Sequence, residues 1–188
     1  DDGPPVDYEA RRQALAALKA TVRPAGEDRR PMVRELIDGR EDGRIKLYLT
    51  WRALTFRREC ELLFRDGGYL PLKAHGDHAE QVCAFTRHLG DETLLVVVPR
   101  LLGGLMGEHD RIPAGKLVWG DTWLELPPER MHESWTNTLT DKTFSTQALG
   151  EAHGLALDQL FDTFPYALLR AHGTGAGSRP SSGFAPMG

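Results

Sequence analysis

Two histidines in the segment HGDH, His75 and His78, have a spacing that could bind a metal ion, with Asp77 between them. A closed structural zinc site needs four ligands, and this polar segment has no second ligand pair nearby. His109 and Asp110 lie in another polar loop with the same shortcoming. We therefore expect turns at both places, and we predict no metal site.

Motifs for nucleophilic and phosphate chemistry are also missing from the sequence. No serine, histidine and acid combination has a recognisable nucleophile elbow. Gly103 and Gly104 are not followed by a lysine at the spacing of a phosphate-binding loop. Residue chemistry alone therefore predicts no catalytic residue and no cofactor.

Tryptophans offer a different kind of site, because exposed indole rings stack on sugars. Trp119 and Trp123 flank the tight turn at Gly120-Asp121, and Trp135 follows soon after. Sugar stacking by these residues would make the chain a free-standing carbohydrate-binding β-domain. Packing in a core and at a strand edge explains the same residues and is the favoured interpretation. Both remain open at this stage.

The elements that would position these residues change in kind at Gly67-Gly68. Helical patterns precede this pair, and the strongest runs from Asp42, a suitable N-cap, to about Phe64. Trp51 lies on its apolar stripe, so we expect Trp51 to be buried between helices and strands. Two shorter helices are expected before it, at residues 8–22 and 31–39.

Strand patterns follow from Tyr69 onward. The run Leu94–Val98 is continuously apolar, which is typical of a strand buried on both faces. Three hairpins are expected: one about Gly90-Asp91, one pairing 116–119 with 122–126, and one pairing 135–139 with 143–145. The predicted fold class is α+β, with N-terminal helices followed by a C-terminal antiparallel β-sandwich. The predicted divisions are a helical segment 1–66, a β-domain 67–171 and a flexible tail 172–188.

Composition excludes some partners. The net charge of −4 argues against nucleic acid and anionic membranes. The longest apolar run, Leu94–Val98, is far shorter than the ~20 residues that span a bilayer. The two cysteines, Cys60 and Cys83, are expected to be buried free thiols, which fits a reducing, cytoplasmic location. The chain does not begin with methionine, which fits a fragment of a longer protein.

Five sequence blocks, in order, carry a family resemblance. They are DGRIKLYLTWRAL at 42–54, LFRDGGYLPL at 63–72, LLVVVPRLL at 94–102, VWGDTWLELP at 118–127 and ALDQLFDTFPYALL at 156–169. These blocks resemble maltooligosyltrehalose synthases, which are members of the α-amylase family. The start of the chain, DDGPPVDY, resembles the loop and helix start that follow the last catalytic segment of that family. There the family usually has an asparagine and two arginines, where this chain has Asp2, Gly3 and Pro4.

The resemblance implies an enzyme of trehalose biosynthesis with a catalytic (β/α)₈ barrel and a C-terminal β-sandwich. Such an enzyme isomerises the reducing-end α-1,4 link of a maltooligosaccharide to an α,α-1,1 link. It does so by intramolecular glucosyl transfer between two carboxyl groups. The family's catalytic carboxylates all lie N-terminal to the matching blocks. This segment is therefore expected to be structural and inactive alone, with the catalytic barrel as its partner.

The resemblance also suggests which residues lie near substrate and which pack on the barrel. Asp1 and Asp2 of the loop, with Arg44 and Lys46 of the strongest block, are the substrate-adjacent candidates. The apolar helix residues 32, 33, 36 and 37, with the alanine-rich face of 10–22, are expected to pack on the barrel.

Overall fold

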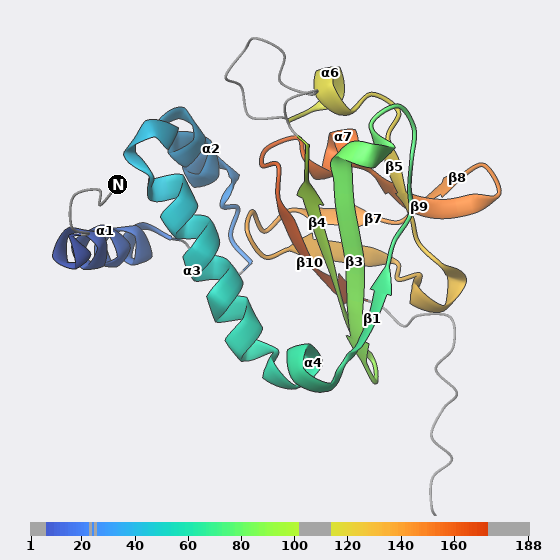
Figure 1. The fold of residues 1–188 in the computed structure, drawn as a ribbon, viewed down its shortest axis with the longest axis horizontal. Coiled ribbons are helices and arrows are strands. Elements are labelled where there is room, and N and C mark those ends of the chain that lie inside the picture. Colours follow the sequence, from blue (N-terminus) through green and yellow to red (C-terminus); the bar gives the residue numbers. More distant parts are fainter. Residues whose placement is uncertain (1–6, 23, 25, 102–113, 173–188) are drawn as a thin grey trace, which may run out of the picture.

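The computed structural model describes residues 7–22, 24, 26–101 and 114–172 (Figure 1). Helices come first and antiparallel strands follow, with the change at Gly67-Gly68 as predicted. The fold class predicted from the sequence is therefore confirmed. Asp1, Asp2, His109, Asp110 and most of the expected tail lie outside the described residues.

Four α-helices and a short 3₁₀ turn form the first part. They are α1 (Tyr8–Thr21), α2 (Arg30–Asp38), η1 (Arg40–Asp42), α3 (Arg44–Glu59) and α4 (Glu61–Asp66). Asp7 caps α1 by accepting a hydrogen bond from the main-chain nitrogen of Ala10 at 2.9 Å. The third helix begins slightly later than predicted, because Gly43 adopts φ +77° at its N-cap.

Within the described ranges, ten strands form two antiparallel sheets. The larger has the order β1 (Gly68–Pro71), β3 (Val82–Leu89), β4 (Glu92–Pro99), β10 (Ala167–His172), β6 (Ser134–Asn137) and β7 (Thr143–Ser145). The smaller has the order β2 (Ala74–His75), β5 (Trp123–Glu125), β9 (Ala152–Ala156) and β8 (Gln147–Leu149). Short helical turns lie between the strands: η2 (Ala79–Gln81), α6 (Lys116–Trp119), η3 (Pro128–Arg130) and α7 (Leu157–Leu160).

Two of the three expected hairpins are present. Leu89 pairs with Glu92, so Gly90-Asp91 is a two-residue turn between β3 and β4, with Gly90 at φ +57°. Strands β6 and β7 also pair as predicted. The prediction of a hairpin at 116–126 is wrong. Residues 116–119 form a helical turn, and β5 pairs with β2 and β9 instead.

Two hydrophobic cores explain why the central strand is apolar throughout. Leu95 and Val97 of β4 belong to the core between the sheets, and Leu94 belongs to the core between the larger sheet and the helices. Strand β4 is thus buried on both faces, as predicted. The helix-side core draws residues from both sides of position 66, and the domain boundary placed there stays a prediction.

Three burial expectations need correction. Trp51 is only half-buried, because α3 directs Tyr48 and Phe56 into the helix-side core instead. Cys83 is exposed on β3, while Cys60 is buried as expected. Val33 and Leu36 were expected to pack on the catalytic barrel. They are instead 0% and 2% exposed, because the helix-side core of this chain covers them.

In the part of the chain that the structure describes, no helix is long and apolar enough to cross a membrane.

Candidate functional site

A groove of about 560 Å³ runs between α1 and α3 and contains two of the predicted site residues, Arg44 and Lys46. Its described lining is Ala10, Arg11, Ala14, Asp42, Gly43, Arg44, Lys46, Leu47 and Thr50. Ala10 and Ala14 of α1 and Gly43 at the N-cap of α3 keep the groove open, since their small side chains fill little of the space between the helices. The other predicted members, Asp1 and Asp2, lie outside the described residues.

Arg44 is held by its own neighbours. Its Nε lies 2.7 Å from Oδ2 of Asp42, and its Nη1 lies 3.7 Å from Oε1 of Glu35. The main-chain nitrogen of Arg44 donates to Asp42 as well, at 2.8 Å. Hydrogen bonds from the backbone and then the side chain of Arg44 lower the pKa of Asp42. Asp42 is therefore ionised at neutral pH.

The charges of this groove limit its chemistry. Retaining glycosyl transfer uses two carboxyl groups about 5–5.5 Å apart, one ionised and one protonated. Asp42 is the sole carboxylate among the described residues that line the groove. The groove could hold a polar group or a protein segment, but these residues do not form the acid and nucleophile pair.

Two of the three tryptophans are core residues. Trp119 and Trp135 are both 0% exposed. The ring of Trp119 packs against Phe161 with centroids 5.1 Å apart, and Nε1 of Trp135 donates to Oγ1 of Thr146 at 3.2 Å. A sugar ring cannot reach either indole, which corrects the stacking interpretation for both.

Trp123 is half-buried, and its ring has a close neighbour on each of the two adjacent strands. His75 stacks on it with centroids 4.4 Å apart and planes 13° apart. On the other strand, a Cβ atom built at Gly154 would approach Cε3 of Trp123 to 2.8 Å, so the ring lies against that glycine. The glycine in β9 makes room for the indole. This packing disfavours sugar stacking by Trp123 too.

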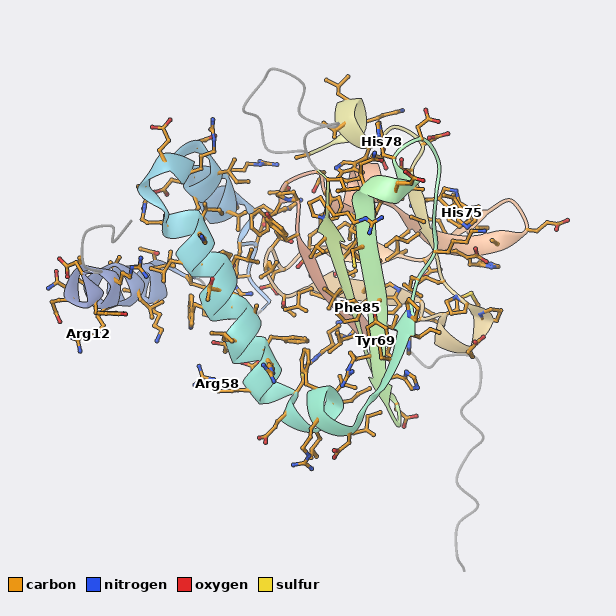
Figure 2. All side chains as sticks on the ribbon, viewed as in Figure 1. Arg12, Arg58, Tyr69, His75, His78 and Phe85 are labelled. Carbon is orange, nitrogen blue, oxygen red and sulfur yellow. The ribbon has the colours of Figure 1, made fainter. Side chains whose placement is uncertain are left out.

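The two histidines of HGDH have separate partners (Figure 2). His75 Nε2 lies 2.7 Å from Oε2 of Glu125, on the neighbouring strand. The main-chain nitrogen of His78 donates to Oγ1 of Thr122 at 3.2 Å, and its ring meets Trp119 edge-on. Over the described part of the chain, no group of three or more His, Cys, Asp or Glu residues could hold a metal.

A buried polar cluster was not foreseen from the sequence. Arg29 is 3% exposed, lies 3.5 Å from Oδ2 of Asp141, and donates to the main-chain oxygen of Thr138 at 3.1 Å. Arg52 donates to the same oxygen at 3.0 Å, and Tyr48 donates to the oxygen of Leu139. The cluster fastens the β6–β7 connection to the helices. Its members lie far apart in sequence, so spacing gave no signal.

Comparison with known proteins gives an informative match to a solved structure. No protein-family model matches the chain, and no curated protein matches it. Among solved structures, a mutant of maltooligosyltrehalose synthase from Arthrobacter ramosus is similar over 90% of this chain, with 25% identity and a TM-score of 0.58. The resemblance to maltooligosyltrehalose synthases is confirmed. This chain spans only 17% of that protein's length.

A second structure, a noncanonic maltogenic α-amylase AmyB from Thermotoga neapolitana, matches at 14% identity over 58% of this chain and 21% of that one. Its TM-score of 0.39 is too low to support an inference. The chain is thus similar to part of a maltooligosyltrehalose synthase.

Proposed function

We propose that the chain is a non-catalytic domain of a glucosylmutase that converts maltooligosaccharides to maltooligosyl trehaloses. The observation that supports this most is the match to a maltooligosyltrehalose synthase over 90% of this chain but 17% of the other. A match of this kind is expected of an accessory domain. The same proposal includes a catalytic barrel as the partner, a maltooligosaccharide as the substrate, and a role in trehalose biosynthesis.

The chemistry of the described residues supports a non-catalytic role. The reaction breaks one glucosidic bond and forms another with retention, which requires a nucleophilic carboxylate and a second carboxyl that donates and recovers a proton. The groove between α1 and α3 offers Asp42 as its described carboxylate, and Arg44 holds it ionised. In the proposal, the catalytic barrel supplies both reacting groups.

The proposal keeps a cytoplasmic location. Cys60 and Cys83 are both free thiols, which suits a reducing compartment. The alternative of a free-standing carbohydrate-binding domain is disfavoured, because Trp119 and Trp135 are buried and His75 already stacks on Trp123.

The test is to incubate maltopentaose with the 188-residue chain and with the full-length enzyme that carries it. We expect the full-length enzyme to remove reducing ends without releasing glucose or maltose, and the chain alone to leave the substrate unchanged. Conversion by the chain alone would refute the non-catalytic role. Release of short reducing sugars as the main product of the full-length enzyme would refute the glucosylmutase assignment.

A further inference from the structure

Helix α3 carries apolar residues beyond the two that it buries fully in the helix-side core. Tyr48 and Phe56 point into the helix-side core and are 0% and 3% exposed. Leu47, Trp51 and Leu54 are spaced four and three residues apart, so they are neighbours along the helix. Leu47 and Trp51 are half-buried and lie at the edge of the helix-side core. Leu54 remains 51% exposed. Leu54 is thus a large apolar side chain that the described part of the chain leaves open to solvent.

The side of α3 on which Leu54 lies follows from Arg58, which is one helical turn beyond Leu54. Figure 2 shows Arg58 on the side of α3 that is turned away from the sheets. Leu62, in the first turn of α4, is 57% exposed. Leu47, Trp51, Leu54 and Leu62 are together called the outward stripe. The exposed part of the outward stripe at Leu54 thus lies on the side of α3 that is turned away from the sheets.

Helix α1 borders the outward stripe and packs on the rest of the chain through few of its residues. Leu18 is the one buried residue of α1, and Tyr8 at its start is 71% exposed. Isolated helices shorter than about 12–15 residues are marginal in water, so a helix of this length depends on contacts with other elements. The groove between α1 and α3, with a volume of about 560 Å³, adds unfilled space beside Leu47.

We propose that the outward stripe, together with α1, is the surface on which the catalytic domain of the same enzyme docks. This inference rests on the proposed function. The relative's chain is almost six times as long as the part matched here, so a large domain on the same polypeptide is the expected neighbour.

Contacts within the surface favour a protein partner over a sugar. Lys19 Nζ and the guanidinium of Arg52 lie 5.7 Å and 5.6 Å from the ring centroid of Trp51, so cations already sit against this indole. Lys46 and Arg58 are exposed toward the two ends of α3. An apolar stripe with cations at its ends fits a protein surface with an apolar centre and acidic residues at its edge.

Thiol labelling tests the assignment. Cys83 is exposed and Cys60 is buried, so Cys83→Ser gives a background of low reactivity. Leu54→Cys on this background places a thiol on the outward stripe. Glu151→Cys places a matched exposed thiol on the β8–β9 turn, which lies at the opposite end of the molecule from α1 (Figure 1). Both variants are made in the 188-residue chain and in the full-length enzyme.

In the full-length enzyme, we expect the Leu54→Cys thiol to react at least about 100-fold more slowly than in the chain, while Glu151→Cys changes by less than about twofold. Equal reactivity of Leu54→Cys in both proteins would overturn the docking surface. Protection in the chain alone that grows with its concentration would overturn it as well, because a second copy would then be the occupant.

The assay also separates this inference from the function on which it rests. Protection of Leu54→Cys in a full-length protein that lacks glucosylmutase activity would refute the proposed function and support the docking surface. Glucosylmutase activity with an unprotected Leu54→Cys thiol would refute the docking surface alone.

Discussion

Tyr48, in the middle of α3, donates its hydroxyl hydrogen to the main-chain oxygen of Leu139, in the connection between β6 and β7. Both residues are 0% exposed. A hydrogen bond between buried groups joins two parts of the chain that no regular secondary structure links. It is a direct tie between the helix layer and the far end of the larger sheet.

Tyr48→Phe should destabilise the chain by about 1–3 kcal/mol, because it leaves the buried oxygen of Leu139 without this donor. The midpoint of urea unfolding measures the change. Tyr69→Phe is the matched control, because the Tyr69 side chain is 56% exposed and the change should be close to neutral. Equal midpoints for Tyr48→Phe and the native chain would show that the bond contributes nothing.

Burial also makes Tyr48 a source of pH dependence, since it raises the pKa of the phenol to about 12 from 10.0. The unfolded chain loses this proton near the lower value and the folded chain near the higher one. The stability that depends on the neutral phenol is therefore intact below pH 10 and is lost as the pH rises toward 12.

Relative to Tyr48→Phe, the native chain should lose up to about 1.4 kcal/mol of unfolding free energy per pH unit in this window. Urea unfolding of both proteins across the alkaline range measures the difference, which cancels the titration of other groups. Parallel stability curves would contradict the predicted effect of burial.

Arg29→Met should destabilise the chain by about 3–5 kcal/mol, because it leaves the Asp141 carboxylate without a buried cation. Arg12→Met is the control, since Arg12 pairs with Glu9 on an exposed part of α1 and such pairs contribute about 0–1 kcal/mol. Thermal unfolding followed by circular dichroism compares the two. A similar small shift for both would mean that the buried pair is not a structural link.

Gly154→Ala should destabilise the sandwich by at least about 1–3 kcal/mol, because the new Cβ would lie 2.0 Å from the main-chain oxygen of Leu124. Gly90→Asn is the control at an open turn, where no atom lies within 4 Å and asparagine tolerates the positive φ. The midpoints of denaturant unfolding of the two variants measure the difference. A Gly154→Ala variant as stable as the native chain would contradict the close approach of β5 and β9.

Local patterns predicted the parts of the fold that depend on local interactions. Gly90-Asp91 predicted its hairpin because a two-residue turn needs positive φ, and Leu94–Val98 predicted a doubly buried strand because every residue is apolar. Residues 116–119 were misassigned because four apolar or amphipathic residues before a glycine fit a strand and a helical turn equally. Tertiary packing decided between them, through the burial of Trp119.

The buried polar cluster around Arg29 was harder to predict, because its contacts are non-local. Arg29 and Thr138 are 109 residues apart, so no spacing rule could have paired them. The outward stripe could not be predicted from the sequence for a related reason. In the sequence, Leu54 belongs to the same broad apolar stripe as Tyr48 and Phe56. Only the structure shows that the core buries Tyr48 and Phe56 and leaves Leu54 exposed.

The central claim is that the chain stabilises a catalytic domain without supplying a reacting group. The most direct measurement compares the full-length enzyme with a version that lacks this chain, by thermal melting and by the production of non-reducing product from maltopentaose. We predict that the shortened enzyme melts at a lower temperature and loses activity because its docking partner is gone. An unchanged melting temperature with full activity would contradict the claim.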